Sequence, residues 1–263
     1  MIPVDLYDSN NVLRRVTERH GMPSVIPMGF RQRYEFTMAK PPGSQVWVWD
    51  GRGHNEMRKS IIPDYKGQRE PMAQDIFAQI NMWRDALKMS TAISVTAPGW
   101  EADDVIATLA VRWAKAGRRV RVHSNDIDYG QLAAIPNIEV IGVNPKDCPP
   151  EWLPLRKALV GKASDNMKGI PGFGPKRFDS MQHLFAEIQG CIEQGDHKRL
   201  ISYGEWTPAV RAWLTVPENF ELLQKMLQVS KFFTVPDDEI FAGWTVGTPD
   251  RIKAHAMMDE FFL

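Results

Sequence analysis

Residues 97–113 read Ala97-Pro-Gly-Trp-Glu101-Ala-Asp103-Asp104-Val-Ile-Ala-Thr-Leu-Ala-Val-Arg-Trp113. They follow a short run, residues 92–95, whose β-branched side chains predict a strand. From position 106 onward the apolar residues recur three, four and seven positions apart, a spacing typical of an amphipathic helix. The stretch therefore predicts a strand, a tight connection and a helix, which is the repeating unit of an α/β fold.

The first turn of this helix carries three acids, Glu101, Asp103 and Asp104. A single acid there is enough to complement the helix dipole, a stabilisation of about 0.3–1 kcal/mol. Three carboxylates so close together repel one another unless a cation lies among them. Taken alone, the stretch leaves dipole compensation and metal binding as alternatives.

Acids also follow three further strand-like segments. Strands are predicted at residues 4–7, 45–49, 119–123 and 138–141, and the first three lead into Asp8, Asp50, and Asp126 with Asp128. Strands that alternate with helical stretches indicate βαβ units and a mainly parallel sheet. Ligands of such sheets bind outside the carboxyl ends of the strands. The pattern favours a divalent-metal site at that edge.

Composition excludes several classes of protein. The chain has 263 residues and a formal net charge of zero, so a nucleic-acid partner has to be argued from local clusters of charge. Cys148 and Cys191 form neither a metal spacing nor a disulfide framework. No apolar run approaches the roughly 18 residues of a membrane span, and no signal peptide is recognisable. These features predict a soluble cytoplasmic protein.

A basic segment lies between the second and third predicted strands. It contains Arg52, Arg58, Lys59, Lys66 and Arg69, and it is followed by a predicted helix over residues 72–89. The segment could be a solvated surface. The alternative is a phosphate-contacting segment beside the acidic edge.

A glycine-rich stretch, residues 169–177, reads Gly-Ile-Pro-Gly-Phe-Gly-Pro-Lys-Arg. It lacks the third glycine and the preceding strand of a dinucleotide-binding fingerprint. Between helical segments it suits a hairpin turn whose backbone amides hold a phosphate, and Lys168, Lys176 and Arg177 add positive charge. A plain tight turn is the alternative. Further helices are predicted after Pro217 and Pro249.

The ordered series of these motifs resembles the 5′-3′ exonuclease and flap endonuclease family, which includes the 5′-nuclease domain of bacterial DNA polymerase I. The series runs from Asp8-Ser-Asn-Asn through Pro63-Asp-Tyr-Lys-Gly-Gln-Arg69 and Glu101-Ala-Asp-Asp104 to Ser164-Asp-Asn-Met-Lys-Gly-Ile-Pro-Gly-Phe-Gly-Pro-Lys176. The resemblance implies a PIN-like α/β core over residues 1–148, including a helical arch at 52–90. Residues 149–263 would form a helical region with a helix-hairpin-helix motif. The implied substrate is DNA with a 5′ end or flap, cleaved by a monomer without membrane attachment.

The resemblance also assigns roles to residues. Metal ligands would be the eight acids Asp8, Asp50, Glu101, Asp103, Asp104, Asp126, Asp128 and Asp165, which would hold two Mg²⁺ ions, with Mn²⁺ as a substitute. The last three would form the second metal site. Tyr65, Lys66 and Arg69 would contact the scissile nucleotide. DNA contacts would come from Arg52, Arg58, Lys59, Lys168, Gly172, Gly174, Lys176 and Arg177, with K⁺ at the glycine-rich turn.

The sequence departs from the family pattern at Lys162, where an aspartate is usual three positions before the residue matched by Asp165. We therefore predict a weakened second metal site. Lys162 is expected either to turn outward or to stand in for part of the cation charge.

Two other functions remain open. A PIN-type ribonuclease could use a similar acidic edge, although it would not explain the Tyr65–Arg69 segment or the glycine-rich turn. A DNA-junction-binding protein that has lost its second metal and its catalysis is the other alternative. A phosphotransferase that uses Asp126 and Asp128 is a more distant one, because no nucleophile accompanies them.

Overall fold

The computed structural model describes residues 2–20, 26–143 and 148–262. The chain divides into two compact units. The sheet unit comprises Met1–His54, Glu70–Asn144 and Phe233–Leu263, and the helical unit comprises Asn55–Arg69 and Pro145–Phe232. Each unit is built from segments that are distant in the sequence. No helix among the described residues has the length and apolar character needed to cross a membrane.

The sheet unit contains a six-stranded sheet of order β5-β4-β1-β2-β3-β6. Its strands are β1 (Val4–Asp8), β2 (Gln45–Trp49), β3 (Ile93–Thr96), β4 (Val120–His123), β5 (Ile138–Ile141) and β6 (Trp244–Val246). Neighbours pair in parallel except β3 and β6, which are antiparallel. Every residue of β1 and β2 is buried, as expected for central parallel strands covered on both faces. The mainly parallel sheet that the sequence predicts is confirmed.

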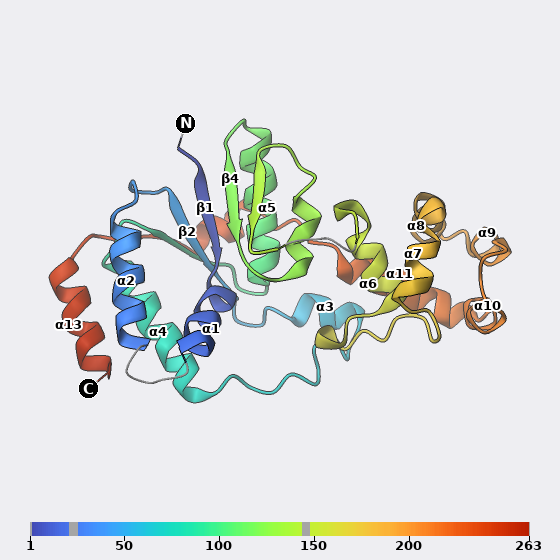
Figure 1. The fold of residues 1–263 in the computed structure, drawn as a ribbon, viewed down its shortest axis with the longest axis horizontal. Helices are drawn as coiled ribbons and strands as arrows, with labels where there is room; N and C mark the ends of the chain where they lie inside the picture. Colours follow the sequence, from blue (N-terminus) through green and yellow to red (C-terminus); the bar gives the residue numbers. More distant parts are fainter. Residues whose placement is uncertain (1, 21–25, 144–147, 263) are drawn as a thin grey trace. The chain divides into compact units, whose positions relative to one another are not determined.

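Helices cover both faces of this sheet (Figure 1). One face carries α5 (Ala102–Lys115), and the other carries α1 (Ser9–His20), α2 (Ile26–Met38), α4 (Gln74–Lys88) and α13 (Arg251–Phe262). The aromatic rings of Tyr7 and Trp47 stack at 4.4 Å between centroids within the core of the second face. The remaining helices of the unit are η1 (Ile127–Leu132) and α12 (Asp237–Ala242).

The helical unit has its own hydrophobic core. Its helices are α3 (Glu56–Ile61), η2 (Pro150–Trp152), α6 (Leu153–Val160), η3 (Ala163–Asp165), α7 (Pro175–Ser180), η4 (Gln182–Leu184), α8 (Phe185–Gln194), α9 (His197–Ser202), α10 (Pro208–Thr215) and α11 (Pro217–Ser230). Phe178 and Phe185 stack at its centre, 4.2 Å apart. The glycine-rich stretch forms the connection that leads into α7.

The division into units differs from the predicted boundaries in two places. Residues 55–69, expected as part of the arch of the catalytic core, belong to the helical unit because Tyr65 packs into its hydrophobic core. Residues 233–262, expected in the helical region, belong to the sheet unit because β6 pairs with β3. The helix predicted at residues 72–89 is present as α4.

Candidate functional site

Several acidic residues follow the strands at the carboxyl edge of the sheet. Asp8 is the last residue of β1, Asp50 follows β2 directly, and Asp126 comes three residues after β4 ends. Glu101, in the connection after β3, is the residue that precedes α5. Because β4, β1, β2 and β3 are consecutive neighbours in the sheet, its topology brings these connections to one edge.

Gly51 allows two of these connections to approach closely. A Cβ atom at this position would lie 1.9 Å from the carbonyl oxygen of Ala97, so no side chain fits. The amide of Gly51 donates to the carbonyl oxygen of Trp100 at 3.0 Å. The neighbouring Asp50 carboxylate accepts from the amide of Ala102 at 2.9 Å. The first turn of α5 and the end of β2 are thereby held together.

Asp8 and Asp50 influence each other electrostatically. The Asp8 side chain is buried, and burial together with the negative charge of Asp50 raises its pKa to about 7, with Asp126 adding to the effect. Hydrogen bonds from Ser124 (2.9 Å) and from the amide of Asn11 (3.2 Å) act in the opposite direction. The negative charge of Asp50 disfavours ionisation of Asp8. A cation bound between the two carboxylates would offset this repulsion and favour the ionised form of both.

The acids of α5 are fixed by donors from elsewhere in the sheet unit. The buried Asp104 accepts a hydrogen bond from the amide of Phe233 at 2.8 Å. Asp103 accepts from the hydroxyl of Tyr129 at 2.7 Å. Burial and the charge of Asp103 raise the pKa of Tyr129 far above its ordinary value, so this hydroxyl stays protonated and donates.

Sequence reasoning missed the polar residues that orient the acids. Asn10 donates to Asp50 at 2.7 Å, and Ser124 and Tyr129 donate to Asp8 and Asp103. The signal was present, since Asn10 and Ser124 each lie within two residues of an acid in a predicted connection. Asp126 accepts from the amide of Asp128 at 3.0 Å, which makes a tight turn at the start of η1.

The donor set of the sheet edge fits a hard divalent cation, because it consists of carboxylate oxygens. Such an ion would offset the electrostatic repulsion between Asp8 and its acidic neighbours Asp50 and Asp126. Within the described residues, however, no three Asp, Glu, His or Cys side chains are positioned to coordinate one metal ion together. The acids instead accept hydrogen bonds, so metal binding at this edge would require some of their side chains to reorient.

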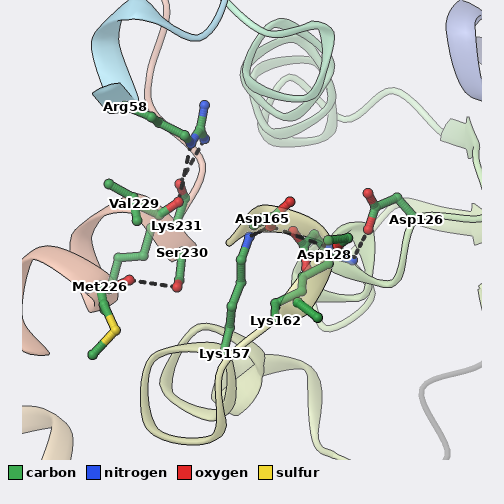
Figure 2. A network of polar contacts seen from close by, with 12 residues as sticks. Arg58, Asp126, Asp128, Lys157, Lys162, Asp165, Met226, Val229, Ser230 and Lys231 are labelled. Atoms are coloured by element: carbon green, nitrogen blue, oxygen red, sulfur yellow. Dashed lines mark hydrogen bonds and ion pairs between the residues drawn. The ribbon is translucent and has the colours of Figure 1, made fainter. Parts of the chain in front are cut away.

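Asp165 lies in the helical unit, in surroundings unlike those of the other acids. Its Oδ2 atom is 2.6 Å from Nζ of Lys157 and 3.8 Å from Nζ of Lys162, and its Oδ1 atom is 3.0 Å from Nη2 of Arg69 (Figure 2 shows the two lysines). Burial alone would raise its pKa, but the positive charges of Lys157 and Lys162 outweigh burial and lower it. The Lys162 side chain is directed toward Asp165 and does not turn outward.

The segment with Tyr65, Lys66 and Arg69 contacts the turn that contains Asp165. The amide of Lys66 donates to the carbonyl oxygen of Asp165 at 3.0 Å, and Arg69 Nε donates to that of Ser164 at 3.0 Å. Lys66 and Arg69 thus contact the turn that contains Asp165. The Tyr65 ring is 2% exposed and packs in the hydrophobic core, which does not fit the expected stacking on a nucleotide.

Arg58 also differs from expectation. It is 3% exposed, and its guanidinium donates to the carbonyl oxygens of Val229 and Lys231, each at 3.2 Å, so it terminates helix α11 rather than facing a phosphate (Figure 2). The other expected DNA contacts lie nearer the surface. Arg52, Lys59, Lys168, Gly172 and Lys176 are exposed, and Gly174 and Arg177 are partly buried.

Comparison with known proteins places this geometry in a family. The model of the 5′-3′ exonuclease N-terminal resolvase-like domain matches residues 7–152. A flap endonuclease Xni of Photorhabdus laumondii is 33% identical over 75% of this chain and 83% of its own length. The flap endonuclease Xni of Pectobacterium carotovorum is 26% identical over 86% of this chain and 97% of its own length.

Solved structures agree on the fold. A zinc-bound T5 5′-exonuclease superposes with a TM-score of 0.65 at 20% identity, covering 99% of this chain and 97% of its own. A T5 flap endonuclease variant in complex with DNA and metal ions superposes with a TM-score of 0.59 at 17% identity, covering 99% and 96%. With the family model matched over more than half of its length, this chain belongs to the 5′-3′ exonuclease family.

Proposed function

We propose that this protein is a structure-specific 5′ nuclease that hydrolyses phosphodiester bonds of DNA at 5′ ends or flaps. The observation that carries the proposal is the buried carboxyl of Asp8 beside Asp50 at the carboxyl edge of the sheet, with Asp104 fixed on the adjoining helix. Such an arrangement costs folding energy through repulsion and desolvation, a cost that proteins tolerate at functional sites.

The acids of the sheet unit would form the metal site of this nuclease. Asp8, Asp50, Glu101, Asp103 and Asp104 would hold a divalent ion, Mg²⁺ or Mn²⁺, with Asp126 and Asp128 beside them. Such an ion supplies a water of lowered pKa and stabilises the leaving 3′ oxygen. Asn10, Ser124 and Tyr129 hold three of these carboxylates in place. The expected products are a 5′-phosphate and a 3′-hydroxyl.

Positive side chains would position the DNA. Lys66 and Arg69 would offset charge on the scissile phosphate, where one such donor contributes about 10²–10³ in rate. Arg52, Lys59, Lys168, Lys176 and Arg177 would contact the backbone of the duplex, with K⁺ at the glycine-rich turn as a further ligand. A net charge of zero does not oppose this role, since binding to phosphates depends on local clusters.

The surroundings of Asp165 favour one alternative, a DNA-binding protein that no longer cleaves. The ion pairs of Asp165 with Lys157 and Lys162 would keep it from serving as an ordinary metal ligand. We prefer the nuclease because the acids of the sheet unit remain together without this carboxylate.

A cleavage assay distinguishes the candidates. We expect the protein to cut a 5′-flap duplex in Mg²⁺ or Mn²⁺ and to leave single-stranded RNA uncut. Asp104→Asn should abolish cleavage while DNA affinity in EDTA is retained. Asp238→Asn, at an exposed acid of the same unit, is the matched control and should cleave normally. Cleavage by Asp104→Asn at the normal rate would refute the assigned site, and binding without cleavage by the unmodified protein would favour the non-catalytic alternative.

A further inference from the structure

A carboxylate contacted by cations lies in the helical unit. Asp165 is 1% exposed, and both of its oxygens are engaged: Oδ2 by Lys157 and Lys162, and Oδ1 by Arg69. Lys157 is itself buried, with 7% of its side chain exposed. Figure 2 shows the two lysines extending toward Asp165 from α6 and from the turn that precedes η3.

The backbone holds this cluster in one geometry. Lys162 and Met167 exchange two backbone hydrogen bonds, of 2.9 and 3.2 Å, which close a tight turn around Asp165. Gly161 and Gly169 enclose this turn, and a Cβ atom at Gly169 would lie 2.4 Å from backbone of α6. Gln68 and Arg69 donate to the carbonyl oxygens of Ala163 and Ser164 in the same turn. The lysines and Asp165 are thus arranged before any ligand arrives.

These surroundings do not fit a divalent-metal ligand. A metal ion approaching Asp165 would have to come within a few ångströms of the ammonium of Lys157, whose side chain is buried. The repulsion between fixed cations and an added cation is strong where water is excluded. Because the ammonium and guanidinium groups already neutralise the Asp165 carboxylate, it also attracts a divalent cation less strongly.

Lys157, Lys162 and Arg69 bring three positively charged groups to the Asp165 carboxylate. A group of this composition attracts phosphate, and Arg69 presents the planar donors that bind phosphate oxygens in pairs. Arg69 is 48% exposed and Lys162 21%, so part of the cluster can be reached by a ligand.

We propose that Asp165 is the internal counter-ion of a fixed cation group, Lys157, Lys162 and Arg69, which binds a DNA phosphate in place of a second divalent ion. The choice of DNA as the source of the phosphate rests on the proposed function. Asp165 is then a positioning residue that holds the lysines, and Lys162 is the group that distinguishes this chain from the family pattern.

The first test counts divalent ions without DNA or catalysis. Mn²⁺ is titrated calorimetrically into the full chain and into Asp165→Asn, with circular dichroism to check folding. The proposal expects the same number of Mn²⁺ sites in both proteins. Loss of one Mn²⁺ site in folded Asp165→Asn would overturn it.

The second test measures binding of a 5′-flap duplex in EDTA between 50 and 200 mM salt, and it does not depend on the folding of Asp165→Asn. Lys162→Met should weaken binding and reduce the slope of log affinity against log salt by about 0.9, the value for one lost phosphate contact. Lys225→Met, at an exposed lysine of α11 in the same unit, is the control and should keep the normal slope. An unchanged slope for Lys162→Met would overturn the proposal.

Neither test requires cleavage, so the outcomes separate the two hypotheses. Absence of flap cleavage by the unmodified protein would refute the nuclease while leaving the cation group standing. A normal salt slope in Lys162→Met would refute the cation group while leaving the nuclease standing.

Discussion

Arg58 donates a hydrogen bond from Nε to the carbonyl oxygen of Val229 at 3.2 Å, across 171 positions of sequence. The bond joins α3 to the last turn of α11, where helix carbonyls lack intrahelical partners. The segment that carries Lys66 and Arg69 is thereby fixed to the C-terminal part of the helical unit.

Arg58→Met is expected to lower the free energy of unfolding by about 1–3 kcal/mol, because buried carbonyl groups lose their donor. Lys59→Met, at the exposed neighbouring position, should leave stability unchanged and weaken DNA binding instead. Urea denaturation and fluorescence anisotropy with a flap duplex measure the two effects. Equal stability of both variants would contradict the structural role of Arg58.

Asp5 and Asp8, both buried on β1, are expected to respond in opposite ways to neutralisation. The Asp5 carboxylate accepts from Arg121 at 2.6 and 2.8 Å and contacts His123 at 2.9 Å, and these hydrogen bonds outweigh burial and lower its pKa. Asp5→Asn should cost about 1–3 kcal/mol at neutral pH. Asp8→Asn should instead stabilise the metal-free protein by about 1–2 kcal/mol at pH 8.

The pH dependence follows from the sign of the Asp8 shift. Its pKa rises from 3.8 to about 7 on folding, so the folded state binds the proton more tightly. The metal-free protein should therefore lose stability as pH rises through this window, and Asp8→Asn should remove that loss. Thermal unfolding at pH 5 and pH 8 in EDTA tests this, and a variant with the same pH dependence as the unmodified protein would refute the electrostatic assignment.

Lys66→Ala and Arg69→Ala are each expected to slow single-turnover cleavage of a 5′-flap duplex by about 10²–10³. Arg69→Ala should also release one partner of Asp165. Lys225→Ala provides the control for loss of a positive charge. Rates within a factor of two of the unmodified enzyme would exclude a role for these side chains at the scissile phosphate.

Tyr129→Phe removes the hydrogen bond from the Tyr129 hydroxyl to Asp103 while keeping the buried ring. Residues that hydrogen-bond to a metal-ligating side chain, as Tyr129 does to Asp103, typically contribute 10- to 100-fold to metal affinity. The Mn²⁺ dissociation constant should therefore rise by at least about tenfold. An unchanged constant in a stable variant would show that Asp103 takes no part in metal binding.

Lys162→Asp reverses the departure from the family pattern. Replacing an ammonium by a carboxylate next to Asp165 should increase Mn²⁺ affinity and alter the Mg²⁺ dependence of cleavage. Calorimetry and cleavage at varied Mg²⁺ provide the measurements. If neither quantity changes, Lys162 is not what limits divalent binding here.

The sheet could be predicted from sequence because its central strands are continuous β-branched and aromatic runs, buried on both faces. The strands at residues 45–49 and 138–141 match prediction, and the other three predicted strands agree to within one residue. Strand β6 could not be predicted, because it is only three residues long and is formed by pairing with β3, some 150 positions earlier in the sequence.

The position of Asp8, Asp50 and Asp126 at the carboxyl edge of the sheet could be predicted for the same reason, since each follows a recognisable strand. Tyr65 and Arg58 could not be placed correctly, because their polar surroundings in the sequence suggest a surface. The hydrophobic core that buries Tyr65, and the helix end that engages Arg58, are formed by residues between 148 and 231, far from either. The assignments of individual metal ligands and DNA contacts stay predictions for the experiments above.

The hydrogen bond from the amide of Phe233 to Asp104 ties the acidic edge to a late part of the chain. A nascent polypeptide that has emerged from the ribosome only as far as residue 232 lacks both this donor and strand β6, which pairs with one edge of β3. Its carboxylates cannot yet be held in their final positions. Translation itself would thus delay nuclease activity until the helical unit has been synthesised and the chain has returned to the sheet.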